Sequence, residues 1–197
     1  ADLGPEAVRL QARTFERLVT GQIMESVGGE GDQLAHYLKV VADKTGSLIA
    51  TSARFGAMIG GASLEVVETL TRFGELIGVA FQLADDVIDI ASESGESGKT
   101  PGTDLREGVP TLVTLHVMAS SNPADAALKE ILSQPIEDEK VVAEVLVALQ
   151  AHPALQISRT QLHEYSNGAK ASLETLPESA AKDALESLCD AIIERSA

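Results

Sequence analysis

Three aspartates, Asp85, Asp86 and Asp89, follow nine uncharged residues, Leu76–Ala84, in the stretch LIGVAFQLADDVID. Spacings of three and four residues place these carboxylates on one side of a helix. They stand near the predicted C-terminal end of that helix, where the helix dipole favours cations. The apolar lead-in predicts burial, which makes unpaired charges unfavourable. The pattern therefore predicts a bound cation, although a solvated acidic helix face would have the same spacing.

The donor types indicate which cation fits. Carboxylate oxygens suit Mg²⁺ or Mn²⁺, which keep several waters and usually bridge to substrate phosphates. No histidine follows an acid by three residues, which excludes the Glu-x-x-His pair of a di-iron bundle; the histidines are His36, His116, His152 and His163. The single Cys189 excludes a disulfide framework and a cysteine zinc site.

Two lysines could add an anion-binding function to this cation site. Lys99 is the only base before Arg106 in the loop Ser94–Gly108, and Lys44 precedes Thr45 in a segment of mostly apolar or small residues. Each lysine alone is equally consistent with an ordinary loop or surface residue. A divalent cation and lysines together form a phosphate clamp, so the combination favours a phosphorylated substrate.

The elements that must position these residues are predicted to be helices. Helical spacing and Pro, Gly and Ser punctuation predict an all-α bundle, and sustained alternation typical of strands is missing. The expected helices cover residues of about 5–27, 33–60, 63–91, 110–119, 123–132, 138–150, 153–176 and 178–195. A loop is expected over Ala91–Gly108.

Small residues recur through the middle helices, among them Ala50, Gly56, Gly74 and Gly78. Glycine inside a helix is less favourable than alanine by about 1 kcal/mol, so this many glycines need a reason. Close approach of helices around a shared cavity is one explanation, and a tightly packed core without a cavity is the other.

Composition excludes several classes of protein. The 197 residues carry a net charge of −15, which argues against nucleic-acid binding because that requires a basic face. The longest uncharged run, Gly108–Ala124, contains Pro110 and Pro123 and is too short to span a bilayer. We expect a cytoplasmic protein that has at most transient contact with a membrane surface.

Four blocks of the chain resemble the trans-type polyprenyl diphosphate synthases. They are LVTGQIMES (Leu18–Ser26), YLKVVADKTGSLIATSARFGAMIGGA (Tyr37–Ala62), GVAFQLADDVIDI (Gly78–Ile90) and SGKTPGTDLREGVPTL (Ser97–Leu112). Their order is similar to the C-terminal part of that family. The resemblance implies that residues 1–197 are part of a single domain of the isoprenoid-synthase helical fold, lacking its N-terminal helices.

The resemblance also implies an activity. Such enzymes join isopentenyl diphosphate head-to-tail to an allylic diphosphate, and they commonly act as homodimers. Two or three Mg²⁺ ions per complete site, which Mn²⁺ could replace, assist departure of the allylic diphosphate. By similarity, Asp85, Asp86 and Asp89 form the second aspartate-rich motif, with Asp85 as the expected direct ligand.

The remaining site residues follow from the same similarity. Lys44 and Lys99 would hold the allylic diphosphate, while Thr45 and Gln82 would lie along the reacting prenyl chain or its diphosphate. Gln22 is expected to face the cavity. Asp104 is expected to have a structural role.

The family's first aspartate-rich motif does not occur in this sequence. We therefore expect a truncated or proteolytic piece of a longer enzyme that has no turnover by itself. Two other interpretations remain open at this point. One is a partner subunit of a two-chain prenyl synthase, and the other is a lyase similar to terpene cyclases, although two Tyr, four Phe and no Trp are few aromatics for a cyclase cavity.

Overall fold

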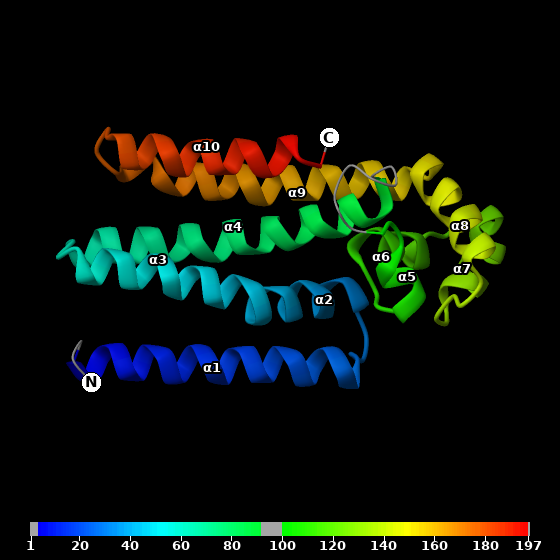
Figure 1. The fold of residues 1–197 in the computed structure, drawn as a ribbon, viewed down its shortest axis with the longest axis horizontal. Coiled ribbons are helices and arrows are strands. Elements are labelled where there is room, and N and C mark those ends of the chain that lie inside the picture. The colour runs from blue at the N-terminus through cyan, green and yellow to red at the C-terminus, as the bar shows by residue number, and fades with distance from the viewer. Residues whose placement is uncertain (1–3, 92–99, 197) are drawn as a thin grey trace. The chain divides into compact units, whose positions relative to one another are not determined.

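The computed structural model describes residues 4–91 and 100–196. Helices dominate these residues and no strand occurs among them, which confirms the predicted all-α class (Figure 1). The chain divides into two compact units. The first comprises residues 1–82 and 163–194, and the second comprises residues 83–162 and 195–197.

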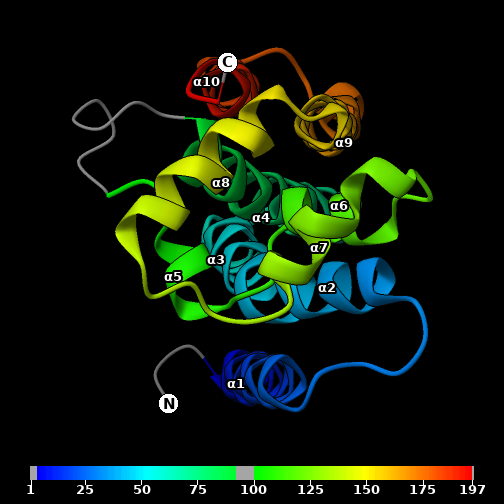
Figure 2. The ribbon, with the colours of Figure 1, turned by 90° about the vertical axis from the view of Figure 1, so that its right-hand side faces the viewer.

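The first unit is built mainly from long helices. Figures 1 and 2 show α1 lying beside α2 and α3. The last part of α9 pairs with α10 through two contacts: Ser166 Oγ donates to the Cys189 carbonyl at 2.9 Å, and Lys170 Nζ donates to Asp190 at 2.8 Å. The elements of this unit are α1 (Gly4–Val27), α2 (Gln33–Val41), a π-helical turn (Ala42–Gly46), α3 (Ser47–Ile59), most of α4 (Leu64–Ala91), the end of α9 (Pro153–Ser172), a 3-10 turn (Leu173–Thr175) and α10 (Ala180–Glu194).

Local sequence signals set the boundary between α1 and α2. Gly28 and Gly31 adopt φ values of 75° and 85°, a left-handed conformation that favours glycine and ends the helix. Asp32 then caps α2, because its side chain accepts hydrogen bonds from the backbone N–H groups of Leu34 and Ala35. The chain thus reverses between two helices that pack against each other.

Glycines allow α4 to approach α3 and the π-helical turn closely. A Cβ atom at Gly74 would lie 2.6 Å from Ala50 Cα, and one at Gly78 would lie 2.8 Å from Gly46 Cα. Both distances are shorter than side-chain contacts allow, so these positions require glycine. Helices thus approach closely at these two positions, as both explanations of the small residues require, but not at Gly56, where a Cβ would meet nothing within 4 Å.

The second unit is built from shorter helices around its own apolar core. Its elements are the last turns of α4, then α5 (Thr103–Glu107), α6 (Leu112–Ala119), a 3-10 turn (Pro123–Asp125), α7 (Ala126–Leu132), α8 (Glu139–Ala151) and the first part of α9. The core includes Val87, Ile90, Val113, Val117 and Leu149, all of which are fully buried. Gln150 Nε2 donates to the Ile90 carbonyl at 2.9 Å and so satisfies a carbonyl at the end of α4.

Two elements differ from the sequence-based expectation. The helix expected over residues 33–60 is interrupted by the π-helical turn Ala42–Gly46, and the loop expected over 91–108 contains the short helix α5. Most other helix boundaries lie within about two residues of those predicted. Gly102 and Gly108 flank α5 with φ values of 76° and 68°, so the glycines that indicated a loop delimit a helix instead.

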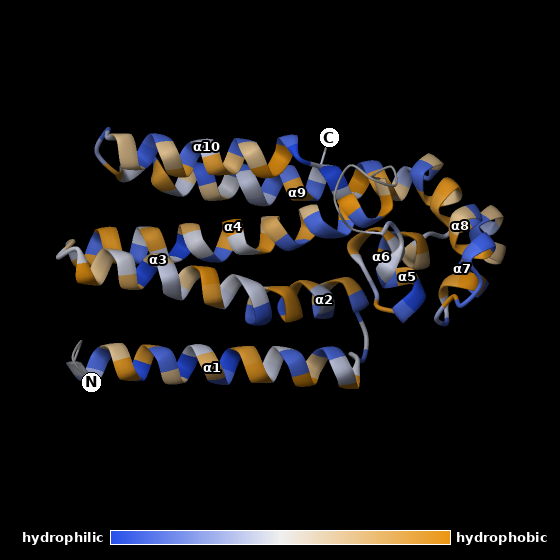
Figure 3. Cartoon of the chain, viewed as in Figure 1, coloured by the Kyte–Doolittle hydropathy of each residue, from blue (hydrophilic) through white to orange (hydrophobic). Residues whose placement is uncertain are grey.

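Hydrophilic and hydrophobic residues are interspersed along most helices (Figure 3). Within the described part of the chain, no single helix has the length and apolar character needed to cross a membrane. One bent pair, Glu139–Ala151 with Pro153–Thr175, meets those two criteria only when its members are taken together.

Candidate functional site

Lys44 and Thr45 lie in the π-helical turn of the first unit. Such turns interrupt the regular hydrogen-bond pattern of an α-helix and frequently occur at functional sites. Asp43 and Gly46 of this turn are buried, whereas the Lys44 side chain is 30 % exposed. The Lys44 side chain is therefore partly accessible, although two other residues of the same turn are buried.

Asp43 anchors the turn through its carboxylate. Arg17 Nε donates to Asp43 Oδ1 at 2.9 Å, and Lys39 Nζ donates to Oδ2 at 2.8 Å. Burial disfavours the charged carboxylate, but the hydrogen bonds from Lys39 and Arg17 outweigh it and hold the pKa of Asp43 below its ordinary value. Gly21 permits this proximity, because a Cβ there would lie 3.0 Å from Asp43 Cβ.

Arg17 connects three elements of the first unit. Its Nη2 donates to Glu75 Oε1 at 2.6 Å, in addition to the Nε bond to Asp43. Ser47 Oγ adds a bond of 2.6 Å to the Asp43 carbonyl. The turn is therefore fixed by side chains from α1, α2 and α3, and Glu75 of α4 holds Arg17 in place.

Lys44 forms an ion pair with Glu25 of α1. Its Nζ lies 2.9 Å and 2.7 Å from the two carboxylate oxygens. Gln22, which we expected to face a cavity, is exposed and donates to Glu25 Oε2 at 2.8 Å. An anionic ligand at Lys44 would thus have to replace or share an internal carboxylate partner.

Thr45 and Gln82 contact each other. Thr45 Oγ1 donates to Gln82 Oε1 at 3.3 Å. The structure therefore joins two of the predicted site residues, which lie 37 positions apart in the sequence. This bond orients the Gln82 amide, with its oxygen toward Thr45.

In the second unit, two of the three aspartates bind the backbone of neighbouring helices. Asp86 is 4 % exposed, and its Oδ2 accepts from Leu112 N, the first residue of α6, at 2.8 Å. Asp89 is 7 % exposed and accepts from the N–H groups of Thr103 and Asp104 at 3.1 and 3.3 Å, at the start of α5. Both carboxylates therefore satisfy N–H groups that have no partner inside their own helices.

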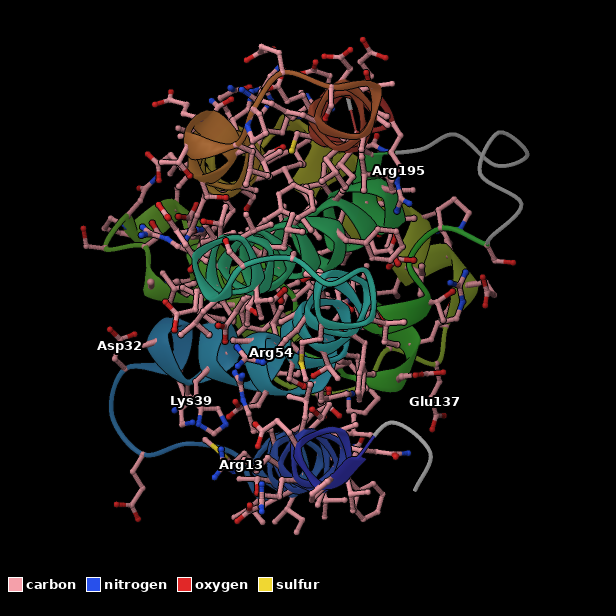
Figure 4. The ribbon with its side chains drawn as sticks, turned by 90° about the vertical axis from the view of Figure 1, so that its left-hand side faces the viewer. Arg13, Asp32, Lys39, Arg54, Glu137 and Arg195 are labelled. Atoms are coloured by element: carbon pink, nitrogen blue, oxygen red, sulfur yellow. The ribbon has the colours of Figure 1, made fainter. Side chains whose placement is uncertain are left out.

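Asp85 has a different environment from its two neighbours. Its side chain is 23 % exposed, and its Oδ1 accepts a hydrogen bond from Arg195 Nη2 in an ion pair. A guanidinium therefore provides positive charge to the carboxylate that we expected to contact a metal directly. Figure 4 labels Arg195, which directly follows α10.

Two further predicted residues are placed as follows. Asp104 lies in the first turn of α5, and its carbonyl accepts from Val109 N at 2.9 Å. Lys99 lies outside the described residues. Over residues 4–91 and 100–196, no group of three or more His, Cys, Asp or Glu side chains is arranged to hold a metal ion.

A comparison with known protein families identifies the family to which this sequence is similar. The polyprenyl synthetase family model matches residues 2–149. The chain belongs to the polyprenyl synthetase family. The family assignment made from the four sequence blocks is thereby confirmed, and it covers the Lys44 turn and the aspartate-rich end of α4.

This member of the polyprenyl synthetase family is similar to proteins of known type. It is 47 % identical over 197 residues to a nonaprenyl diphosphate synthase of Mycobacterium tuberculosis, covering 99 % of this chain and 59 % of that protein. A dimethylallyltranstransferase of the same organism is 37 % identical over 190 residues. That match covers 95 % of this chain and 57 % of the relative. The chain therefore spans about three-fifths of the length of these curated relatives.

The fold of this chain is also similar to that of a solved structure. Geranylgeranyl pyrophosphate synthase from Corynebacterium glutamicum, complexed with calcium and isoprenyl diphosphate, matches with a TM-score of 0.91 and 40 % identity. The match covers 99 % of this chain and 61 % of that one. The all-α fold of this polyprenyl synthetase family member is therefore that of the synthase.

Sequence reasoning missed the charged partners of the predicted residues. Asp43 was detectable in principle, because Lys39 precedes it by four residues, a spacing that pairs charges on a helix. Glu25 and Arg195 had no such signal, because they lie 19 and 110 positions from Lys44 and Asp85. Only the tertiary structure of this polyprenyl synthetase family member brings them together.

Proposed function

We propose that the protein is a prenyltransferase that condenses isopentenyl diphosphate with an allylic diphosphate to give a linear polyprenyl diphosphate. Membership of the polyprenyl synthetase family carries this proposal. The names of the two M. tuberculosis relatives, a nonaprenyl diphosphate synthase and a dimethylallyltranstransferase, support the same reaction class.

The proposed site offers a divalent cation one protein carboxylate, that of Asp85. Mg²⁺ is usually bound by one or two protein carboxylates, with substrate phosphates and waters as the other ligands. Asp85 meets this description, because its carboxylate is partly exposed. A bound cation would replace Arg195 as its partner or share the carboxylate with it. The relative from C. glutamicum, complexed with calcium and isoprenyl diphosphate, supports the binding of both a divalent cation and a diphosphate.

We assign different roles to the three aspartates within the proposed Mg²⁺ site. Asp85 is the proposed direct ligand. Asp86 and Asp89 contribute negative charge nearby while their side chains hold the starts of α6 and α5. When bound, Mg²⁺ would neutralise charge on the leaving diphosphate.

The reaction breaks the bond between the allylic carbon and the diphosphate oxygen, and the diphosphate leaves with the electron pair. The double bond of isopentenyl diphosphate then supplies the electrons of the new carbon–carbon bond, and a proton is lost. Lys44 is proposed to bind the departing diphosphate after exchanging its Glu25 partner. Lys99, outside the described residues, is proposed for the same role.

Thr45 and Gln82 are proposed to line the path of the reacting prenyl chain. Their mutual hydrogen bond orients two polar groups without adding a full charge. Such fixed dipoles can stabilise positive charge at the allylic carbon without binding it irreversibly.

We further propose that this chain alone does not complete the reaction, because its sequence contains one aspartate-rich motif. The whole enzyme is proposed to be a homodimer. Exposed hydrophobic side chains along α1 support association, since contiguous apolar surface is typical of interfaces; they are Val8, Phe15, Val19, Ile23 and Val27. Light scattering of the purified protein would measure the oligomeric state. Robust turnover by this chain alone would contradict the proposal that it does not complete the reaction.

The proposed function is best tested by substrate binding, which does not require turnover. We expect an allylic thiolodiphosphate, an analogue that ionises poorly, to bind in Mg²⁺ and much more weakly in EDTA. Lys44→Gln should reduce this binding about tenfold, because a charged hydrogen bond is lost. Lys140→Gln is the matched control, because Lys140 is 85 % exposed and its ion pair with Glu144 is long, at 3.8 Å. Equal binding in Mg²⁺ and EDTA would overturn the proposal.

A further inference from the structure

A small open cavity in the first unit is lined by residues of α1, α3 and α4. Its volume is about 290 Å³, at the small end of the range for ligand sites. The lining combines arginines with hydroxyl side chains and includes only one acid; the residues are Glu6, Leu10, Arg13, Thr14, Arg17, Ser47, Ala50, Thr51, Arg54 and Thr71. None of these residues belongs to the site described above except Arg17 and Ser47, which support the Lys44 turn.

The charge of this cavity is opposite to that of the chain as a whole. Three arginines line it in a protein whose net charge is −15. Arg17 is neutralised by Asp43 and Glu75. Neither Arg13 nor Arg54 has an acidic partner within the part of the chain that the structure describes, whereas most other bases there form ion pairs.

The one acid in the lining does not neutralise these arginines. Glu6 Oε2 pairs with Arg9 Nη1 at 3.1 Å, and Arg9 is not among the residues that line the cavity. The guanidinium groups of exposed Arg13 and half-buried Arg54 therefore line one small space without a direct ion pair to Glu6. Figure 4 labels Arg13 on α1 and Arg54 on the neighbouring α3.

Hydroxyl groups complete the lining. Thr14 and Thr51 share a hydrogen bond of 2.6 Å between their Oγ1 atoms, and Arg54 Nη1 donates to Thr71 Oγ1 at 3.3 Å. The bond between Thr71 and Arg54 orients the guanidinium of a half-buried arginine. The hydroxyls of Thr14, Ser47 and Thr71 donate to backbone carbonyls. The guanidinium N–H groups are therefore the donors that this lining offers to phosphate oxygens.

We propose that this cavity binds a small oxyanion of the phosphate class, with Arg13 and Arg54 as its charged ligands. The size of the cavity favours a phosphate group over a large organic molecule. A bound oxyanion would accept hydrogen bonds from both guanidinium groups and pair with their charge. The inference does not depend on the prenyltransferase proposal, because it uses neither Lys44 nor the aspartates.

The cavity also adjoins the base of the Lys44 turn. Arg17 and Ser47 line it, and both bond to Asp43. Because a ligand that binds only the folded state stabilises that state, occupancy of the cavity should raise the unfolding temperature of the chain.

The test is a calorimetric titration of the 197-residue chain with inorganic phosphate, in EDTA and at constant ionic strength set with chloride. We expect one saturable site per chain. Arg54→Gln and Arg13→Gln should each weaken phosphate binding about tenfold, since each removes a charged hydrogen-bond donor. Arg72→Gln is the matched control, because Arg72 is an exposed arginine of α4 that does not line the cavity, and its binding should be unchanged.

Three controls distinguish phosphate binding in this cavity from binding at Lys44, and loss of binding from loss of folding. Lys44→Gln should bind phosphate as the wild type does, which separates this cavity from the proposed diphosphate site. Circular dichroism should show that Arg13→Gln and Arg54→Gln retain the wild-type helix content, and Arg54→Lys should restore part of the affinity. Absence of saturable binding, or equal binding by the wild type and the Arg13→Gln/Arg54→Gln double variant, would overturn the proposal. Loss of binding in Lys44→Gln alone would also overturn it.

Discussion

The Lys44 turn and the aspartate-rich end of α4 present charged residues by different means. In the first unit, Asp43 is fixed by side chains, Arg17 and Lys39. In the second unit, Asp86 and Asp89 are fixed by backbone N–H groups at the starts of α6 and α5. Side-chain pairs can exchange partners one at a time, whereas backbone bonds hold whole helices. The two regions therefore differ in how much structure depends on each charge.

The same comparison separates structural from exchangeable charges within each region. Lys44 and Asp85 are partly exposed and carry internal counter-ions, Glu25 and Arg195 respectively. Asp43, Asp86 and Asp89 are buried. The residues proposed to bind ligands are thus the ones whose partners a ligand can replace, and their buried neighbours hold the backbone.

The largest expected effect comes from Asp86→Ala. It would leave the Leu112 N–H of α6 without its partner in a buried position, so the free energy of unfolding should fall by about 2–3 kcal/mol. Urea unfolding followed by circular dichroism measures this change. Asp85→Ala is the matched control and should lose at most about 1 kcal/mol, because it removes a partly exposed ion pair. Equal losses of unfolding free energy in the two variants would contradict the structural role assigned to Asp86.

Asp43→Asn tests the corresponding anchor in the first unit. At neutral pH it should reduce the free energy of unfolding by about 1–2 kcal/mol, because two charged hydrogen bonds are weakened. The pKa of Asp43 is depressed below 3.8 in the folded protein, so its contribution is present above that pH and is lost as the pH falls through the folded-state pKa. The difference between wild type and variant should therefore shrink in strongly acidic solution. A difference that stays constant from pH 7 to strong acid would contradict this role.

Arg195→Gln should affect ligand binding more than stability. Removing the guanidinium leaves Asp85 without this partner, so the affinity for Mg²⁺ in the presence of the thiolodiphosphate should rise by up to about fivefold, which corresponds to an ion pair of about 1 kcal/mol. Calorimetric titration with Mg²⁺ measures the change. Arg159→Gln, on the same unit, is the control. A lower Mg²⁺ affinity in Arg195→Gln would show that Arg195 assists the bound ligand instead of competing with the cation.

Glu25→Gln is expected to have the smallest effect. It removes the internal partner of Lys44, so the thiolodiphosphate should bind about twofold more tightly, while the unfolding free energy changes by less than about 1 kcal/mol. Fluorescence competition with a labelled diphosphate would measure the affinity. Weaker binding in this variant would indicate that Glu25 orients Lys44 toward the ligand.

Local patterns in the sequence were sufficient to predict most of the fold. Helical periodicity and glycine boundaries predicted α1, α4 and α8 closely, and Gly74 and Gly78 indicated a close helix contact that the structure contains. The π-helical turn was not predictable, because its anchor Asp43 depends on Arg17 from another helix. The helix α5 was missed because its five residues are stabilised by Asp89, which lies 14 positions earlier.

The candidate site was predictable only as a set of residue types. The spacing of Asp85, Asp86 and Asp89 indicated a common function, but it carried no information on their separate environments. Those environments arise from Arg195, Leu112 and Thr103, whose positions near α4 are set by tertiary packing. The roles of the individual aspartates as Mg²⁺ ligands stay predictions.

The most direct test of the account is a Mg²⁺ titration of Asp85→Asn in the presence of the allylic thiolodiphosphate. Asparagine keeps the size of the side chain and removes its charge, so folding should be preserved. Mg²⁺-dependent binding should be lost, while the urea midpoint should stay within error of the wild type. Wild-type Mg²⁺ affinity in Asp85→Asn would contradict the assignment of Asp85 as the residue that binds the cation.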